Sequence, residues 1–127
     1  MKKKDECSIL IVDDSKSMRK VLILILEEAG YKNVHEAIDG NSALAFIKTN
    51  PVDLILGDWI MPGISGLELL EKIRANPKTE SLPFIMISSE ARSVSISNAK
   101  KLRIDGYIAK PFLDQEVVEK VNCALGF

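Results

Sequence analysis

The sequence predicts a doubly wound α/β domain, in which helices cover both faces of a parallel five-stranded sheet. Short apolar runs rich in Val and Ile alternate five times with segments whose apolar residues recur at helical spacing. The runs also lack the polar alternation of a strand with one face in water, so both faces of the sheet must be covered. A length of 127 residues suits one such domain.

The first strand is predicted over residues 8–12 and runs into Asp13-Asp14-Ser15, residue types that cap helices. A helix over about 15–29 follows, and Gly30 stands where a left-handed residue ends a helix. The inward residues of this helix are expected at helical spacing: Met18, Val21, Leu22, Ile25, Leu26 and Ala29. The two other apolar residues, Ile23 and Leu24, either widen the buried face of the helix or form a small contact patch.

The same alternation continues to the end of the chain. A turn at 61–63 precedes the third helix, whose inward residues are Leu67, Leu70 and Ile73. The helix expected at 91–103 is rich in Ser, a mediocre helix former, so we expect it to be marginal. The further predicted elements are strands at 34–37, 53–57, 83–88 and 107–109, and helices at 41–48, 91–103 and from 114 onward.

Composition excludes several classes of function. The chain is 46% hydrophobic and 28% charged, as in ordinary globular proteins, and its net charge of −1 provides no positive field for nucleic acid or an anionic membrane. The longest apolar run, 21–26, is far shorter than the roughly 20 residues of a membrane span. We expect a cytoplasmic protein, a monomer or a weak dimer, that binds neither nucleic acid nor membranes.

The chain end and the cysteines have ordinary interpretations. No apolar segment follows Lys2-Lys3-Lys4, so residues 1–7 are expected to be a solvated polar tail. Cys7 and Cys123 lack the C-x-x-C spacing of metal or redox sites, and we expect both to be reduced, partly buried thiols.

Polar residues gather where the predicted strands end: Asp13 and Asp14 after the first, Asp58 after the third, Ser88 at the end of the fourth and Lys110 after the fifth. Ligands of such sheets bind at this edge. Two carboxylates ~5 Å apart repel by about 3 kcal/mol at an effective dielectric near 20, so three require positive charge, from Lys110 and a divalent cation. An oxygen-rich set of this kind favours Mg²⁺. Metal, ammonium and hydroxyl around a central carboxylate suit phosphoryl transfer to Asp58.

Each of these residues also has a purely structural interpretation. Asp13 or Asp14 can cap the first helix, and Ser88 can bond to the backbone. Tyr107 can be a half-buried core aromatic, and Lys110 can be solvated. Their joint occurrence at strand ends favours the functional interpretation.

Four fragments together resemble the receiver domain of two-component response regulators: Val12-Asp13-Asp14, residues 56–63 around Asp58, Ile87-Ser88-Ser89 and Lys110-Pro111-Phe112. The resemblance spans essentially the whole chain, so we expect one receiver domain over 1–127. It implies a flavodoxin-like (βα)5 fold with strand order 2-1-3-4-5. It also implies an acceptor Asp58 that takes its phosphoryl group from phosphohistidine on a sensor histidine kinase or a histidine phosphotransfer protein.

The resemblance assigns the remaining site residues. Asp14 and Asp58 are expected to bind Mg²⁺ directly, Asp13 mainly through water, and the Ile60 carbonyl as a further ligand. Lys110 and Ser88 are expected to contact phosphoryl oxygens, with Trp59, Ser89 and Pro111 bordering the site and a cis peptide before Pro111. Tyr107 is expected to be the switch aromatic that, with the 91–103 helix, fifth strand and fifth helix, signals to a downstream protein.

The chain departs from the family pattern in a few places. Gly57 is small, Ser88 stands where Thr is common, and Arg103 stands where many relatives have a helix-ending Gly. The apolar Ile60 predicts slow loss of phosphate. The lone His35, in the second strand, is expected to be structural.

Other functions are less well supported. A Mg²⁺-dependent hydrolase of the haloacid dehalogenase type, using an aspartyl phosphate, lacks its D-x-D-x-[TV] signature on the first strand. Nucleotide binding lacks a glycine-rich loop after that strand. An adaptor that is not phosphorylated would have an eroded acidic site. The sequence leaves open whether the protein is a chemotaxis-type regulator or a phosphorelay intermediate.

Overall fold

A computed structural model describes residues 2–59, 63–89 and 101–127. They form one parallel sheet of five strands in the order β2-β1-β3-β4-β5. The fold class and strand order predicted from the sequence are therefore confirmed. The strands are β1 (Ser8–Val12), β2 (Asn33–Ala37), β3 (Leu54–Asp58), β4 (Phe84–Ser88) and β5 (Gly106–Ala109).

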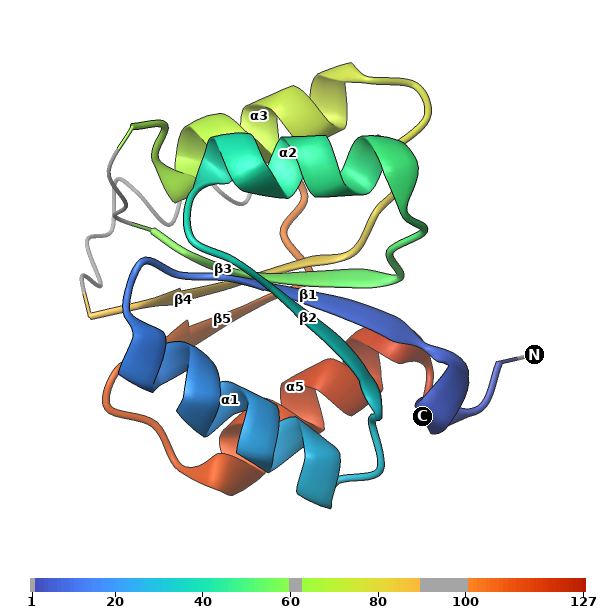
Figure 1. Cartoon of the computed structure of the whole chain (residues 1–127), viewed down its shortest axis with the longest axis vertical. Coiled ribbons are helices and arrows are strands. Elements are labelled where there is room, and N and C mark those ends of the chain that lie inside the picture. Colours follow the sequence, from blue (N-terminus) through green and yellow to red (C-terminus); the bar gives the residue numbers. More distant parts are fainter. Residues whose placement is uncertain (1, 60–62, 90–100) are drawn as a thin grey trace.

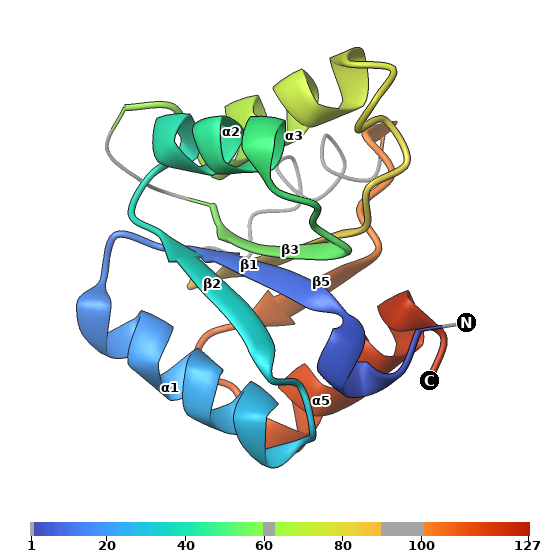
Figure 2. The same cartoon turned by 45° about the vertical axis from the view of Figure 1, so that its right-hand side comes forward.

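Helices cover both faces of the sheet, as Figures 1 and 2 show. One face carries α1 (Lys16–Glu28) and α5 (Asp114–Leu125), and the other carries α2 (Gly40–Thr49) and α3 (Gly66–Ala75). Most of the helix predicted at 91–103, and most of the turn predicted at 61–63, lie outside the described residues.

Two apolar cores lie between the sheet and these helices. Within β1, Ile9 and Ile11 face the core beneath α1 and α5, whereas Leu10 and Val12 face the core beneath α2 and α3. This alternation is the period of two of a strand whose two faces are both buried. All residues of β1 and β4 are buried, while the edge strand β2 is buried only at Ala37.

Local signals in the sequence explain where the helices begin and end. Ser15 caps α1 by accepting a hydrogen bond from the Met18 amide, and Ser65 caps α3 by accepting one from Glu68. Gly30 adopts a φ of 102°, in the left-handed region predicted for it. Arg103 also lies in this region, with a φ of 61°, where a side chain costs roughly 1–2 kcal/mol relative to glycine.

Two predictions about burial were wrong, and one open alternative is now decided. Val21 was expected to point inward but is 44% exposed, because the buried stripe of α1 is limited to Leu22, Ile25 and Leu26. Leu24 is 61% exposed, which fits the contact-patch alternative, whereas Ile23 packs against the core. Cys123 is exposed rather than partly buried, since it lies on the outer side of α5.

The start of the chain is docked rather than wholly solvated. Residues Lys4–Glu6 form a 3-10 turn, and the Lys4 ammonium lies 5.5 Å from the centre of the buried Tyr31 ring. Lys2 forms an ion pair with Asp53 at 3.0 Å, and Cys7 is buried in the core. None of the described helices combines the length and apolar character needed to cross a membrane.

Candidate functional site

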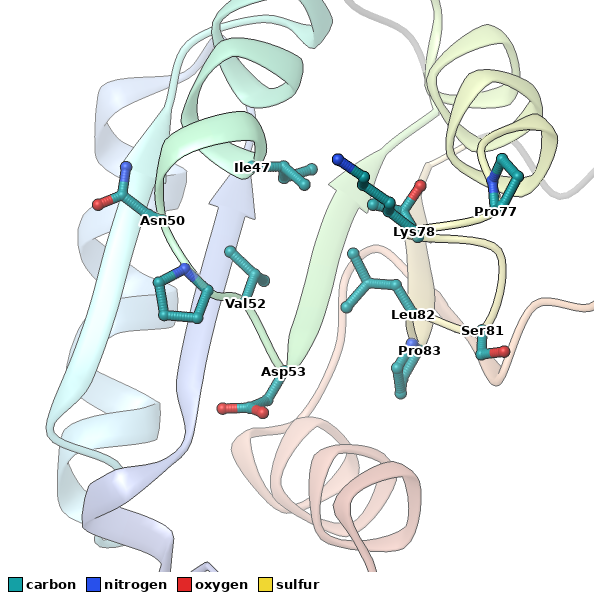
Figure 3. A pocket seen from close by; sticks show the side chains of 11 residues that line it. Ile47, Asn50, Val52, Asp53, Pro77, Lys78, Ser81, Leu82 and Pro83 are labelled. Atoms are coloured by element: carbon teal, nitrogen blue, oxygen red, sulfur yellow. The ribbon is translucent and has the colours of Figure 1, made fainter.

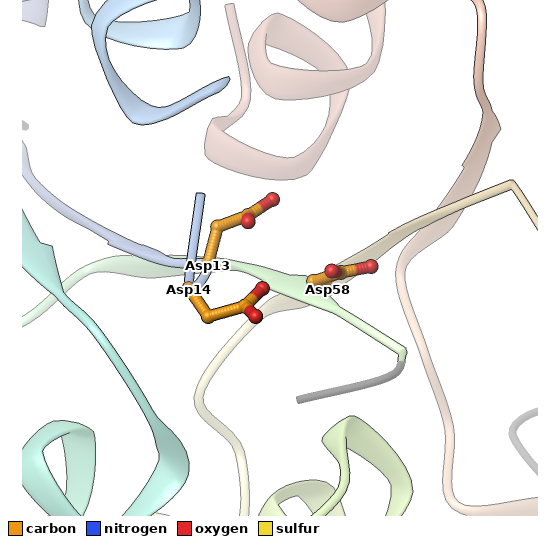
Figure 4. A group of neighbouring side chains, drawn as sticks. All are labelled: Asp13, Asp14 and Asp58. Carbon is orange, nitrogen blue, oxygen red and sulfur yellow. The ribbon is translucent and has the colours of Figure 1, made fainter. Parts of the chain in front are cut away.

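Three carboxylates meet at the carboxyl edge of the sheet. Because β1 and β3 are adjacent and parallel, the residues that end them meet at one edge. Asp13 and Asp14 directly follow β1, and Asp58 is the last residue of β3. One carboxylate oxygen from each residue lies within 4.8 Å of the other two, as Figure 4 illustrates. The structure thus brings together the three acidic residues that the sequence singled out.

Asp13 is the most tightly held of the three. The residue is 2% exposed, and its backbone amide donates to the Ala37 carbonyl at 3.1 Å. Its Oδ1 accepts a hydrogen bond from the Ser15 amide at 2.8 Å. This is a turn that precedes the helix, and Ser15 itself is the helix cap. The structural and functional interpretations of Asp13 are therefore compatible.

Lys110 places a positive charge beside the cluster. Its ammonium lies 3.3 Å from Asp13 Oδ2 and 3.6 Å from Asp58 Oδ1. The side chain comes from the residue after β5, whose backbone amide donates to the Ser88 carbonyl at 2.9 Å. The Lys110–Pro111 peptide is cis, as the resemblance implies. Among the residues that the structure describes, Lys110 is the one cation that forms ion pairs within the cluster, with Asp13 and Asp58.

The pKa of Asp58 reflects both its burial and its charged neighbours. Burial raises the pKa of Asp58 and outweighs the opposing effect of the Lys110 ammonium, while Asp13 raises the pKa further. A hydrogen bond from the Trp59 amide lowers it, and Asp14 raises it slightly. Burial is thus the main reason why the charged form of Asp58 is disfavoured in this site.

The donor set fits a hard divalent cation. All three available ligands are carboxylate oxygens, which Mg²⁺ prefers, and Asp14 is exposed, so that side of the cluster is open to the waters that Mg²⁺ retains. A cation would also relieve the repulsion among the three carboxylates. The predicted ligand at Ile60 lies outside the described residues.

The other predicted residues take places around this edge. Ser88 is 2% exposed, and it ends β4 one residue beyond Ile87, the partner of Asp58 in register. Tyr107 pairs with Met86 and is partly buried against the α2 and α3 side of the core, as is Trp59. Ser89 and Pro111 are exposed at the same end of β4 and β5.

Two residues around the site were missed in the sequence. The Arg19 guanidinium is 11% exposed and donates from Nη1 to the Asp13 carbonyl at 2.8 Å. A Cβ on Gly66 would collide with the Asp58 carbonyl, so this glycine lets α3 start directly against the acceptor strand. Gly66 at the start of a predicted helix could have indicated a close approach of backbone. Arg19 near the start of a helix gives no sign in the sequence that it contacts the site.

The small residue before Asp58 is also explained. A Cβ on Gly57 would lie 2.7 Å from the Phe84 ring, so Gly57 makes room for a buried aromatic of β4. This departure from the family pattern belongs to core packing rather than to the site.

The pocket drawn in Figure 3 has a volume of about 440 Å³ and lies where β3 and β4 begin, which is the edge of the sheet opposite to the acidic cluster. It is lined by the loops that lead into β3 and β4, including Val52, Asp53 and Pro83. Its one carboxylate, on Asp53, is already bonded to Lys2 and to the Ser8 amide. The chemistry therefore points to the acidic edge rather than to this pocket.

The fold and the acidic site together define the class of protein. The chain belongs to the family of response regulator receiver domains, whose model matches residues 9–122. It is a receiver domain of the two-component type, as the sequence predicted, and this membership supports a regulatory role.

Particular relatives are chemotaxis proteins. The chain is 40% identical over 114 residues to chemotaxis protein CheY-3 of Vibrio cholerae, covering 90% of this chain and 88% of the relative. It is 38% identical to chemotaxis protein CheY of Pseudomonas aeruginosa, covering 90% and 92%. A solved response regulator from Chloroflexus aurantiacus superimposes with a TM-score of 0.89 at 34% identity, covering 95% and 98% of the two chains.

Proposed function

We propose that the protein is a phosphorylation-dependent signalling switch in which Asp58 accepts a phosphoryl group from phosphohistidine of a sensor histidine kinase or histidine phosphotransfer protein. The observation that carries the proposal is the cluster of Asp13, Asp14 and Asp58, whose oxygens lie within 4.8 Å of one another. Lys110 pairs with two of these carboxylates, Asp13 and Asp58. Membership of the receiver family supports it. We assign the whole chain to one receiver domain.

Asp58 is the best placed of the three carboxylates to act as the nucleophile. Asp13 already uses Oδ1 to accept the Ser15 amide and directs Oδ2 to Lys110, and Asp14 is exposed. Asp58 ends the central strand between β1 and β4, and its side chain is 13% exposed. In the proposed step an Asp58 oxygen attacks phosphorus, the phosphorus–nitrogen bond of the donor breaks, and the leaving imidazole takes up a proton.

The surrounding residues bind and orient the transferred group. The Lys110 ammonium, 3.6 Å from Asp58 Oδ1, is within reach of a phosphoryl oxygen attached there. The hydroxyl of the buried Ser88 is proposed to donate to another phosphoryl oxygen. Asp13, Asp14 and Asp58 would hold Mg²⁺, which when bound supplies positive charge that offsets the repulsion between carboxylates and phosphate.

The readout is proposed to involve Tyr107 on β5. Its half-buried ring packs against the core. Tyr107 precedes Ala109 by two residues on β5, and Ala109 is the register partner of Ser88 on β4. A shift of the Ser88 hydroxyl toward the phosphoryl group would therefore be transmitted to Tyr107, and from there to the surface of the 91–103 segment, β5 and α5. A downstream protein would bind this surface.

Trp59 provides a direct test because it adjoins the acceptor. We expect its fluorescence to respond to Mg²⁺ and then to beryllofluoride, which mimics a phosphoryl group on Asp58. The Asp58→Ala variant should lose the response to the mimic. No response in the wild type, or the same response to the mimic in the variant, would contradict the proposed site.

A further inference from the structure

We propose that Arg19 is a positioning residue that fixes the metal-binding carboxylates by holding the peptide between Asp13 and Asp14, a role that rests on the function proposed above. The residue matches none of the motifs that carry the family resemblance. It contacts the acidic loop through backbone rather than through a carboxylate.

The guanidinium bridges three elements. Nη1 donates to the Asp13 carbonyl at 2.8 Å, and Nε donates to Glu36 Oε1 at 2.9 Å. Arg19 lies in α1, and Glu36 lies in the edge strand β2, where it is the register partner of Ile11 of β1. The third element is the loop that follows β1, which contains Asp13. Because the donors of a guanidinium lie in one rigid plane, two such bonds determine its orientation. The side chain is also 11% exposed, so few other orientations are open to it.

This contact completes the immobilisation of Asp13. The Asp13 amide donates to Ala37 on one side, and the Asp13 carbonyl accepts from Arg19 on the other. The carbonyl belongs to the peptide unit that leads to Asp14, so Arg19 orients the link between the two carboxylates. With the backbone fixed and Oδ1 held by the Ser15 amide, Oδ2 faces Lys110 and the cluster.

The role of Arg19 is orientation rather than neutralisation. Its charge is already paired with Glu36, which is 43% exposed. Partners that orient metal ligands typically change metal affinity by about 10–100-fold when removed. Since Ser15 continues to hold the Asp13 carboxylate in any Arg19 variant, we expect the lower end, about tenfold.

The test measures the dissociation constant for Mg²⁺ alone by calorimetry, together with stability toward denaturant, so that all proteins are compared while folded. Arg19→Ala should weaken Mg²⁺ binding about tenfold. Arg19→Lys should recover little, because one ammonium cannot reproduce the two bonds of the planar group. Lys20→Ala, at the exposed neighbouring position, should bind as the wild type does.

Two results would overturn the proposal. Loss of stability in Arg19→Ala with unchanged Mg²⁺ affinity would make the residue purely structural. Full affinity in Arg19→Lys would show that charge alone matters.

A double-variant cycle examines the link to β2. Glu36→Ala should weaken Mg²⁺ binding by a few-fold in the wild type and have no effect in Arg19→Ala, because Glu36 acts only through the guanidinium. Independent, additive effects would contradict this link.

The two proposals fail in different ways. If the wild type does not bind Mg²⁺, or if Asp13→Asn binds it equally well, the proposed site is wrong and the role of Arg19 falls with it. If Asp13→Asn weakens binding and Arg19→Ala does not, only the positioning role is wrong.

Discussion

The two edges of the sheet hold carboxylates in opposite circumstances. At the edge where the strands begin, Asp53 accepts from the Ser8 amide at 2.7 Å and pairs with Lys2. Asp105 accepts from the Phe84 amide at 2.8 Å and lies 3.7 Å from Arg74. At the edge where the strands end, Asp13, Asp14 and Asp58 lie together, and among the described residues Lys110 is the cation that pairs with them, at Asp13 and Asp58.

The difference separates a structural role from a functional one. A carboxylate with its own cation and a backbone donor stabilises the fold, because its charge is compensated in the folded state. At the other edge the charge of the buried Asp58 is less well compensated, so it opposes folding until another cation arrives. Variants at the first edge should therefore lose stability, whereas neutralising Asp58 at the second should raise it.

The largest expected effect is at Arg74, which organises the first edge. Its side chain, 7% exposed, donates to the carbonyls of Leu82, Leu102 and Arg103 at 2.6–3.0 Å. Arg74→Ala should lose about 3 kcal/mol of unfolding free energy, since three carbonyls lose their donor and Asp105 loses its cation. Denaturant titration measures the loss, with the exposed Lys72→Ala as the control. A loss below about 1 kcal/mol, or a change in Mg²⁺ affinity, would break the separation of the two edges.

A smaller loss is expected at Asp53. Asp53→Ala removes the acceptor of the Ser8 amide and the partner of Lys2, and should cost about 1–2 kcal/mol. Thermal unfolding measures it, and Asp5→Ala, at an exposed position, should change little. An increase in stability in Asp53→Ala would mean that this edge also carries uncompensated charge.

The opposite sign is expected at Asp58. Because the folded-state pKa of Asp58 is raised, ionisation of this residue costs stability, and that cost appears as pH rises through the raised pKa. Asp58→Asn should therefore be about 1 kcal/mol more stable than the wild type at neutral pH, the low end of the cost of burying an incompletely compensated polar group. The advantage should vanish at strongly acidic pH. Thermal unfolding at several pH values tests this, and a variant less stable than the wild type at neutral pH would contradict it.

The smallest expected effect is at Arg103, whose backbone is strained and which lies near the edge where the strands begin. Arg103→Gly should gain about 0.5 kcal/mol, since relief of the φ of 61° exceeds the entropy that glycine loses on folding. Lys101→Gly, at an exposed position nearby, should instead lose stability. Denaturant midpoints compare the two, and equal losses would show that Arg103 is not strained.

The polar residues of the edge where the strands end could be predicted from the sequence. Strand ends are readable from β-branched runs, so Asp13, Asp14, Asp58, Ser88 and Lys110 could be placed at one edge before any coordinates. The boundary of β1 matches the prediction, and those of the other strands differ by about one residue because element ends follow hydrogen bonding rather than residue type.

The rest depends on contacts that leave no periodic trace. Val21 has the apolar side chain of a core residue, yet it is exposed in α1 and its neighbour Leu22 is buried instead. Arg19 and Arg74 resemble ordinary surface arginines in the sequence, but each side chain reaches carbonyls that only the fold brings near. Long charged side chains that bond to backbone are set by tertiary position, which residue type alone does not specify.

The most direct test of the account is the site of phosphoryl attachment. Incubating the protein with a small phosphoryl donor such as acetyl phosphate and Mg²⁺ should add the mass of one phosphoryl group, located on Asp58 by peptide mapping. Removal of Mg²⁺ should suppress the addition, and Asp58→Asn should remain unmodified. Attachment to another residue of the wild type, or equal modification of Asp58→Asn, would contradict the assignment of Asp58 as the acceptor.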